Sequence, residues 1–366
     1  MPGPGPYALT HSVGCLPKES VEALHAGFIR PWSQLGGDAW HEWLARHDAF
    51  RFALAELLGG MPEEYCAQAN LSSGLSKLLA SLPRDGTSKR VLLAAEDSFP
   101  SLGFVLRQAE RFGYEARLIS RERSPALAET WAQALTDDVR AVLVTHVHSE
   151  TGVVAPVEAI ARLCADREIL CIVDVAQSAG ILPFAVHTLG AHVVLGSCVK
   201  WLCGGPGAGF MWIDPALIER LEPTDVGWFS HAEPFRFDIH SFEYAHDARR
   251  FWGGTPSVAP FVLAAASLQV LNEIGVPAIF AHNRALMEVF AREMPRAWRA
   301  RIPAPEQTGG TLCIRAGSAL DAVRAGLQDA DVRFDCRGEV VRLSFHVVNT
   351  HAHALHVARA WPRDVP

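Results

Sequence analysis

The sequence lacks the patterns that mark most metal, disulfide and membrane proteins. Its eight cysteines form no C-x-x-C pair and no metal-binding spacing with histidine, and its sixteen histidines contain no H-E-x-x-H motif. No apolar run approaches the roughly 18 residues of a membrane-spanning helix, and residues 1–6, M-P-G-P-G-P, do not begin a signal peptide. We therefore expect a cytoplasmic protein with reduced cysteines, no metal site and no membrane partner.

A strong charge of one sign is also missing. The formal net charge is −7, the pI is near 6.1, and the arginines are scattered without a basic run. This gives no reason to expect a nucleic acid or an anionic membrane as a partner. With 366 residues and 49% hydrophobic content, the chain can bury one sizeable core or two adjoining ones.

What is present in the middle of the chain is an alternation of short apolar runs and amphipathic stretches. The runs that we interpret as strands are 91–95, 141–145, 170–174, 192–196 and 209–213. Helical apolar spacing occupies 102–112 and 156–167. Continuous apolar strands separated by helices favour a mostly parallel sheet covered on both faces. In such sheets ligands lie beyond the carboxyl ends of the strands.

The alternation of short apolar runs and amphipathic stretches ends near residue 260. Two long helices are predicted at 260–274 and 277–294, with a bend at Gly275, and strand-like pieces follow at 311–314 and 340–343. We interpret this part as a smaller α+β domain. The predicted organisation is an N-terminal arm that joins the small domain (1–25), a large domain (26–259) and a small C-terminal domain (260–366).

Two polar residues follow buried strands of the predicted sheet. Lys200 comes after the run 192–196 and before a glycine-rich turn, where burial lowers the pKa of an amine and makes it nucleophilic. Asp174 ends its own run and precedes Lys200 by 26 residues (200 − 174), which suits one crossover between parallel strands. A carboxylate there can hold the pyridine nitrogen of pyridoxal 5′-phosphate (PLP) protonated. The alternatives are a lysine that reaches solvent and an aspartate that caps a helix.

The sequence around these residues resembles a known family. The motif D-x-x-Q-S-x-G at 174–180 and the motif G-S-x-x-K-W-L-x-G-G-P-G at 196–207 are similar to those of fold-type I PLP-dependent enzymes of the class V aminotransferase superfamily. Within it the chain looks most like kynureninase. Further resemblances lie at 11–14 (H-S-V-G), 226–231 (V-G-W-F-S-H) and 334–342 (F-D-C-R, then V-R), so the likeness covers almost the whole chain.

The resemblance implies a fold and a set of roles. The fold would be α/β, with a mostly parallel seven-stranded sheet in the large domain and a smaller C-terminal α+β domain. Lys200 and Asp174 would be catalytic and hold PLP, and Arg342 would bind the substrate carboxylate, although such an arginine taken alone is more often a surface charge. The remaining cofactor contacts implied are Leu71, Ser72 and Ser197 at the phosphate, Trp228 at the phosphate or simply packed in the core, Phe99 on the ring, Ser149 and Gln177 at the ring edge, and Thr255 reaching the phosphate of a second subunit in a homodimer.

Three departures from the kynureninase pattern bear on the substrate. Leu102 replaces an aspartate, Val199 replaces a tyrosine, and an asparagine is missing near Thr255. The cysteine desulfurase branch shares G-T-P at 254–256 and R-x-S-F at 342–345, but the loop that carries its nucleophilic cysteine looks shortened. Cys336 is the nearest candidate thiol, and an ordinary half-buried cysteine is the alternative.

The sequence therefore predicts a PLP-dependent enzyme that acts on an amino acid. Kynureninase-like hydrolysis of a Cβ–Cγ bond, or other β-lyase chemistry, is the first hypothesis. A cysteine desulfurase or C–S lyase is the second, followed by an aminotransferase or epimerase. A non-catalytic PLP-fold binding protein is an alternative of another class, which the presence of both Lys200 and Asp174 disfavours.

Overall fold

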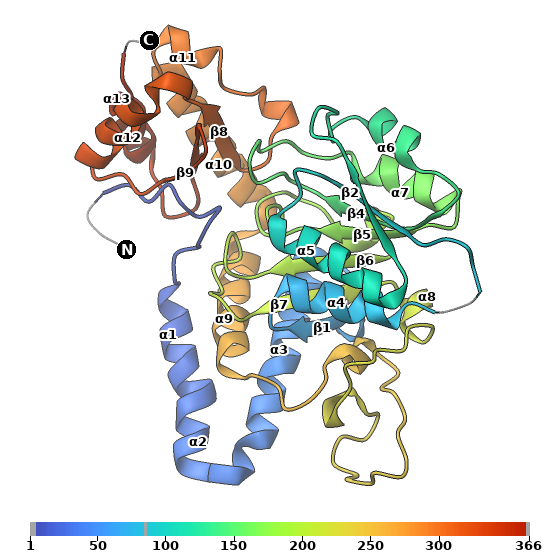
Figure 1. The fold of residues 1–366 in the computed structure, drawn as a ribbon. Coiled ribbons are helices and arrows are strands. Elements are labelled where there is room, and N and C mark those ends of the chain that lie inside the picture. Colours follow the sequence, from blue (N-terminus) through green and yellow to red (C-terminus); the bar gives the residue numbers. More distant parts are fainter. Residues whose placement is uncertain (1–4, 84–85, 364–366) are drawn as a thin grey trace.

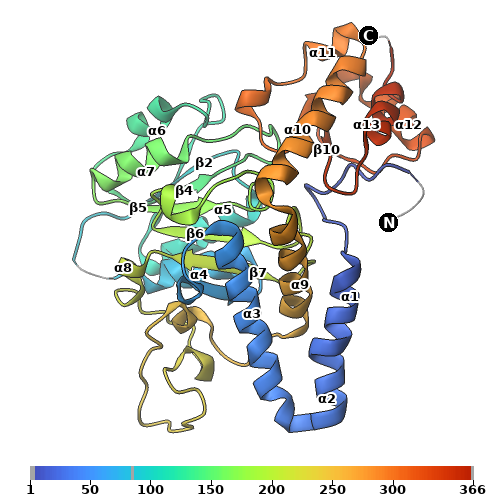
Figure 2. The ribbon, with the colours of Figure 1, turned by 180° about the vertical axis from the view of Figure 1, so that it is seen from behind.

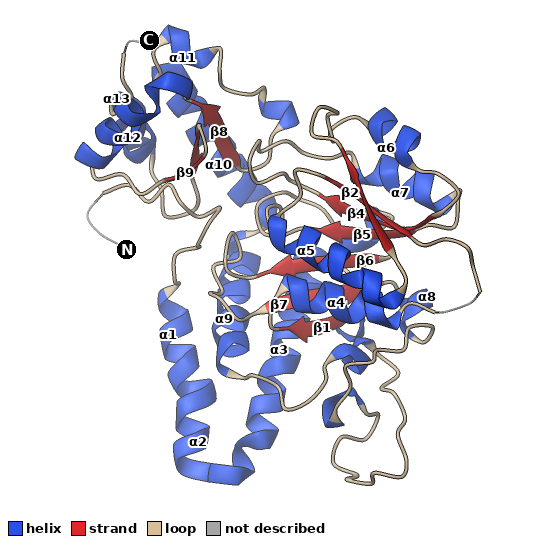
Figure 3. Cartoon of the chain, viewed as in Figure 1, coloured by secondary structure: helices blue, strands red, loops and turns tan. Residues whose placement is uncertain are grey.

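Two β-sheets of different size organise the chain (Figure 1). The computed structural model describes residues 5–83 and 86–363, so most of the proline- and glycine-rich arm at 1–6 lies outside the described residues. Figure 3 shows the larger sheet between helices and the smaller sheet in a separate group of helices above it. The α/β fold with a mostly parallel seven-stranded sheet is confirmed.

The larger sheet has the strand order β1-β7-β6-β5-β4-β2-β3. Its strands are β1 (Tyr65–Gln68), β2 (Val91–Ala95), β3 (Glu115–Ile119), β4 (Val139–Thr145), β5 (Leu170–Asp174), β6 (Val193–Ser197) and β7 (Gly209–Ile213). Strands β3, β2, β4, β5 and β6 are parallel, whereas β7 runs antiparallel to both β6 and β1. All five predicted runs form strands. The two that were missed are β1, which has four residues, and β3, a partly exposed edge strand.

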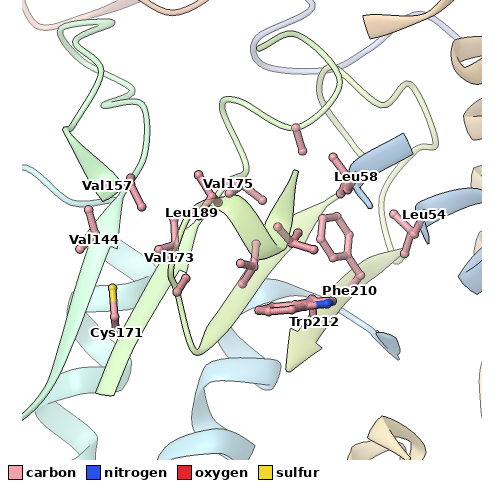
Figure 4. Close-up of a cluster of buried hydrophobic side chains, with 14 of the residues drawn as sticks. Leu54, Leu58, Val144, Val157, Cys171, Val173, Val175, Leu189, Phe210 and Trp212 are labelled. Carbon is pink, nitrogen blue, oxygen red and sulfur yellow. The ribbon is translucent and has the colours of Figure 1, made fainter. Parts of the chain in front are cut away.

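Alternate residues of each strand enter different cores, because successive side chains of a strand point to opposite faces. Leu92 of β2 packs with the helices on one face, and Leu93 packs with those on the other. The first face carries α4 (Leu71–Ser81) and α5 (Pro100–Gln108). The second carries α3 (Trp40–Leu58), α6 (Ala128–Ala134), α7 (Val157–Ala165) and α9 (Ala259–Ile274). Figure 4 shows part of the second core, where Leu54 of α3 approaches Phe210 of β7.

The N-terminal helices form a long helical hairpin beside the sheet. This hairpin begins with α1 (Lys18–Leu24), continues through a π-helical turn (His25–Ile29) into α2 (Arg30–Leu35), and returns along α3. Both α1 and α3 contact α9, and Figure 2 shows the three helices side by side. A short α8 (Pro215–Ile218) follows β7, and an extended loop then leads to α9.

The smaller sheet is antiparallel, with the order β8-β10-β9. It consists of β8 (Thr311–Arg315), β9 (Asp335–Arg337) and β10 (Val340–Ser344), packed with α10 (Val276–Glu293), α11 (Arg296–Arg299), α12 (Leu320–Asp329) and α13 (His351–Arg359). The N-terminal segment joins this unit through bridges from Tyr7 to Arg333 and from Leu9 to Ser344. Within the described residues, no single helix is long and apolar enough to cross a membrane, although the pair α9 and α10, bent by 77°, passes by length and composition.

The predicted domain boundaries, 1–25, 26–259 and 260–366, stay a prediction, and the packing favours one change to them. Phe261 and Leu268 of α9 belong to the core of the larger sheet, whereas Leu286 and Phe290 of α10 belong to the core of the smaller one. The change of core therefore falls at the bend around Gly275 rather than at residue 260.

Candidate active site

A cavity of about 480 Å³ lies at the carboxyl ends of the parallel strands, where α/β folds bind their ligands. Of the residues predicted for the site, those that line this cavity are Leu71, Ser72, Phe99, Ser149, Asp174, Gln177, Ser197 and Lys200. These residues come from five separate segments of the chain. Trp228 and Thr255 lie elsewhere, and Arg342 contacts the cavity wall through Ser149.

One end of the cavity is a helix N-terminus with free donors. Asn70 caps α4, and its side-chain oxygen accepts a hydrogen bond from the backbone N–H of Ser73 at 2.9 Å. The preceding N–H groups of Leu71 and Ser72 have no acceptor among the described residues. Ser197, at the end of β6, adds a hydroxyl to the same cavity. Free N–H groups, the helix dipole and a hydroxyl fit a phosphate group.

Asp174 and Lys200 both line this cavity. Burial raises the pKa of the Asp174 carboxyl, while the Ala176 N–H, which donates to Oδ1 at 2.8 Å, and Lys200 oppose the shift. Burial also lowers the pKa of the Lys200 amine to about 8, and Asp174 partly opposes this shift. A PLP site requires an amine whose pKa lies near neutral pH and a buried carboxylate beside it, and Lys200 and Asp174 form such a pair.

The cavity has an aromatic wall and an apolar lining. Phe99 precedes α5, and its ring centroid lies 5.6 Å from the Lys200 Nζ atom. Thr145 and Asp174, at the carboxyl ends of β4 and β5, line the same cavity. Leu102 and Val199 also line the cavity. Both side chains are aliphatic, so this wall offers a substrate no side-chain hydrogen bond at these two positions.

Gln177 lines the cavity, but its amide is already bonded to the protein. Nε2 donates to the carbonyl oxygen of His11 at 3.1 Å, and Oε1 accepts from the Trp201 indole at 3.3 Å. The side chain therefore ties the N-terminal segment to the turn after Lys200. A contact from Gln177 to the ring edge stays a prediction.

Arg342 is buried beside the cavity and held by an internal carboxylate. Nε donates to Asp335 Oδ1 at 2.7 Å, Nη2 donates to Asp335 Oδ2, and Nη1 donates to the carbonyl oxygen of Ser149 at 2.9 Å. His11 Nε2 also donates to Asp335 at 3.1 Å. Burial would raise the pKa of Asp335, but the hydrogen bonds from His11 and Arg342 hold it well below its usual range. These contacts use three of the five N–H groups of Arg342.

Trp228 and Thr255 contact one another away from the Lys200 cavity. The Trp228 indole donates to Thr255 Oγ1 at 3.2 Å. Thr255 lines a second cavity, of about 270 Å³, together with Ser73 of α4. Since Ser72 lines the first cavity, the two cavities lie on either side of the first turn of α4. Within one subunit Thr255 does not face the Lys200 cavity.

The strand β9 separates the remaining candidates by face. Cys336 packs against the hydrophobic core of the small unit, whereas its neighbours Asp335 and Arg337 project the other way. The Arg337 Nη1 atom donates to Ser149 Oγ at 2.7 Å, and its guanidinium lies 5.4 Å from the Phe99 ring centroid. Arg337 belongs to the F-D-C-R motif, which predicted no role for it, although its spacing of two from Asp335 places both side chains on one face of the strand.

Comparison with known proteins agrees with this geometry. The sequence profile of the aminotransferase class V family matches residues 102–354. Kynureninase from Deinococcus radiodurans is 31% identical over 303 residues, which are 80% of this chain and 72% of that protein. Kynureninase from Pseudomonas fluorescens is 28% identical over 272 residues, 72% of this chain and 62% of that protein. An uncharacterized aminotransferase of Bacillus subtilis, YcbU, is 29% identical over 324 residues, 87% of this chain and 84% of that protein.

Solved structures share the fold at low sequence identity. A mutant of C-DES with glycine covalently linked to its PLP cofactor superposes with a TM-score of 0.86 at 21% identity, over 97% of this chain and 96% of that one. A cysteine desulfurase from Thermococcus onnurineus superposes with a TM-score of 0.82 at 19% identity, over 96% and 92% of the two chains. These likenesses concern the fold.

Proposed function

Since this chain belongs to the class V aminotransferase family of PLP-dependent enzymes, we propose that it breaks a bond to Cβ of an amino acid, as a kynureninase-like Cβ–Cγ hydrolase or a related β-lyase. The observation that carries the proposal is the meeting of Lys200, Asp174 and a free helix N-terminus in one cavity, with Arg342 at its wall. The likeness to kynureninases sets the preferred reaction, and the loss of polar groups at Leu102 and Val199 widens the range of side chains to be tested.

The residues of the cavity divide the work. PLP, when bound, supplies an aldehyde that joins to amines and a ring that withdraws electrons from Cα. The first-turn N–H groups of Leu71 and Ser72 and the Ser197 hydroxyl would hold its phosphate. Asp174 would keep the ring nitrogen protonated, and Phe99 would confine the ring. The Lys200 amine would anchor the cofactor and move the proton at Cα of the substrate, for which a pKa near 8 is suitable.

The position of Cys336 supports this order of hypotheses. A desulfurase needs a thiol that reaches the substrate sulfur, and Cys336 packs into the core of the small unit on the opposite face of β9 from Arg337. β-Lyase chemistry needs no protein thiol. An aminotransferase, which followed the desulfurase among the hypotheses from the sequence, becomes the second candidate, because an uncharacterized relative that matches this chain over 84% of its own length is described as one.

The direct test supplies the PLP-loaded enzyme with L-kynurenine, L-cysteine, L-cystine and other β-substituted amino acids, and measures alanine, pyruvate and sulfide. Alanine from L-kynurenine, or elimination products from another substrate, supports the proposal. Amino-group transfer that depends on an added 2-oxo acid, without cleavage at Cβ, would establish the second candidate instead. A protein that binds PLP but changes no amino acid would be a binding module.

We propose further that the active enzyme is a cytoplasmic homodimer. Thr255 and Trp228 lie beside the α4 terminus but outside the Lys200 cavity, a place suited to serving a second subunit. The neighbouring loop also exposes apolar side chains, Phe237 at 76% and Ile239 at 93%, which a partner would cover. Light scattering should give twice the chain mass, and Thr255→Val should weaken PLP retention. A fully active monomer would refute the dimer.

A further inference from the structure

Two arginines and a single aspartate meet at the wall of the cavity. In the antiparallel pair β9–β10, Asp335 lies opposite Arg342, and Arg337 is two residues further along the same face. Both guanidinium groups converge on one residue, since Arg342 donates to the Ser149 carbonyl oxygen and Arg337 donates to the Ser149 hydroxyl. The two arginines therefore flank the same stretch of cavity wall.

The charge of Arg342 is already compensated inside the protein. Its guanidinium makes two hydrogen bonds to the Asp335 carboxylate. The other partner of Asp335, His11, adds no charge at neutral pH, because burial lowers its pKa to about 4. Arg342 thus offers donors to a ligand, but the Arg342–Asp335 pair offers no net positive charge.

The charge of Arg337 has no such partner. Among residues 5–83 and 86–363, Arg337 forms no ion pair, and its one hydrogen bond is to the neutral hydroxyl of Ser149. The guanidinium is half-buried and lies over the Phe99 ring. Burial lowers the pKa of Arg337, with a further contribution from Arg342, while the nearby carboxylates of Asp335 and Glu150 oppose the shift without pairing directly with Arg337. Arg337 in turn helps to lower the pKa of Lys200. A partly desolvated cation without a counter-ion is costly unless a ligand brings the anion.

We propose that Arg337 completes the site for the α-carboxylate of the substrate and supplies its net positive charge, while Arg342, fixed by Asp335, supplies oriented donors. A carboxylate between the two guanidinium groups and beside Ser149 satisfies both. The inference rests on the proposed function, because it concerns an amino-acid substrate at the Lys200 cavity.

The test compares two ligands that share an amine and differ in charge, L-alanine and L-alaninamide, on the PLP-loaded enzyme. Apparent dissociation constants come from the change in the cofactor absorption with ligand concentration. Arg337→Gln should weaken L-alanine by on the order of 10- to 100-fold, the range for a charge-assisted contact, and change L-alaninamide by less than about twofold. Arg333→Gln, at an exposed arginine four residues earlier in the chain, is the matched control and should change neither.

Two further variants separate a charge effect from a structural one. Arg337→Lys should recover part of the affinity for L-alanine. Asp335→Asn combined with Arg337→Gln should bind L-alanine more tightly than Arg337→Gln alone, because the charge of Arg342 is then uncompensated. A merely structural Arg337 predicts the opposite, a double variant worse than either single one.

The outcomes distinguish the two proposals. If no amino acid alters the absorption of the parent enzyme, the proposed function fails. If the parent responds and Arg337→Gln binds L-alanine as tightly as the parent, or loses both ligands equally, the assignment of Arg337 is wrong while the proposed function stands.

Discussion

The reactivity of Lys200 in the PLP-free enzyme gives the sharpest test of how the cavity is built. Burial lowers the pKa of the amine from 10.5 to about 8. At pH 7 a pKa of about 8 leaves about 9% of the amine neutral, against about 0.03% at an ordinary lysine pKa, a ratio of about 300. Since only the neutral amine is nucleophilic, Lys200 should react at neutral pH far faster than a solvated lysine.

Reductive methylation with formaldehyde and cyanoborohydride measures this residue by residue. The chain has four lysines, Lys18, Lys77, Lys89 and Lys200, so peptide mass spectrometry can follow each of them. The rate at Lys200 should rise with pH and level off above about pH 8, and Lys18, exposed in α1, serves as the internal reference.

Two substitutions should move the pH midpoint of the Lys200 methylation rate in opposite directions. Asp174→Asn removes the carboxylate that raises the pKa of Lys200, so the midpoint should fall. Arg337→Gln removes a positive charge that lowers it, so the midpoint should rise. A Lys200 midpoint near 10, or an upward shift in Asp174→Asn, would refute the account of the site as a desolvated amine balanced by these charges.

Three further variants probe other contacts. Arg342→Lys should keep PLP but need on the order of 10- to 100-fold more amino acid for saturation, since a lysine cannot copy the fork that meets both Asp335 and a carboxylate; unchanged affinity would show that the carboxylate is held elsewhere. Cys336→Ser should leave turnover largely intact, because the thiol packs into the small core, whereas abolished turnover would restore the desulfurase hypothesis. Gly14→Ala would place a Cβ 2.2 Å from the Lys200 carbonyl oxygen, so we expect a loss of about 1–3 kcal/mol in folding stability and weaker PLP retention. Its control is Gly103→Ala in α5, where a Cβ meets nothing within 4 Å; equal melting temperatures for the two variants would contradict the close approach.

Much of the large sheet could be predicted because its strands correspond to apolar runs within short segments of the sequence. Buried parallel strands need continuous apolar runs, and all five runs that were found form strands. Strand ends collect at one edge of a parallel sheet, so Lys200 and Asp174 could be expected together before any contact was known. Strands β1 and β3 were not predicted, because a four-residue strand and a half-exposed edge strand contain too few apolar residues to stand out in the sequence.

The wall of the cavity was decided by the tertiary structure alone. The sequence by itself determined the fold and the cofactor, and it predicted the lysine that would hold this cofactor, through motifs and periodicity that lie within short segments. It did not determine that Asp335 neutralises Arg342, that Arg337 forms no ion pair within the described part of the chain, or that Cys336 packs against the small core. The contact from Arg342 to Ser149 spans 193 residues and joins the two cores. Such contacts depend on how one packed unit lies against the other, and the spacing of residues along the chain does not predict that placement.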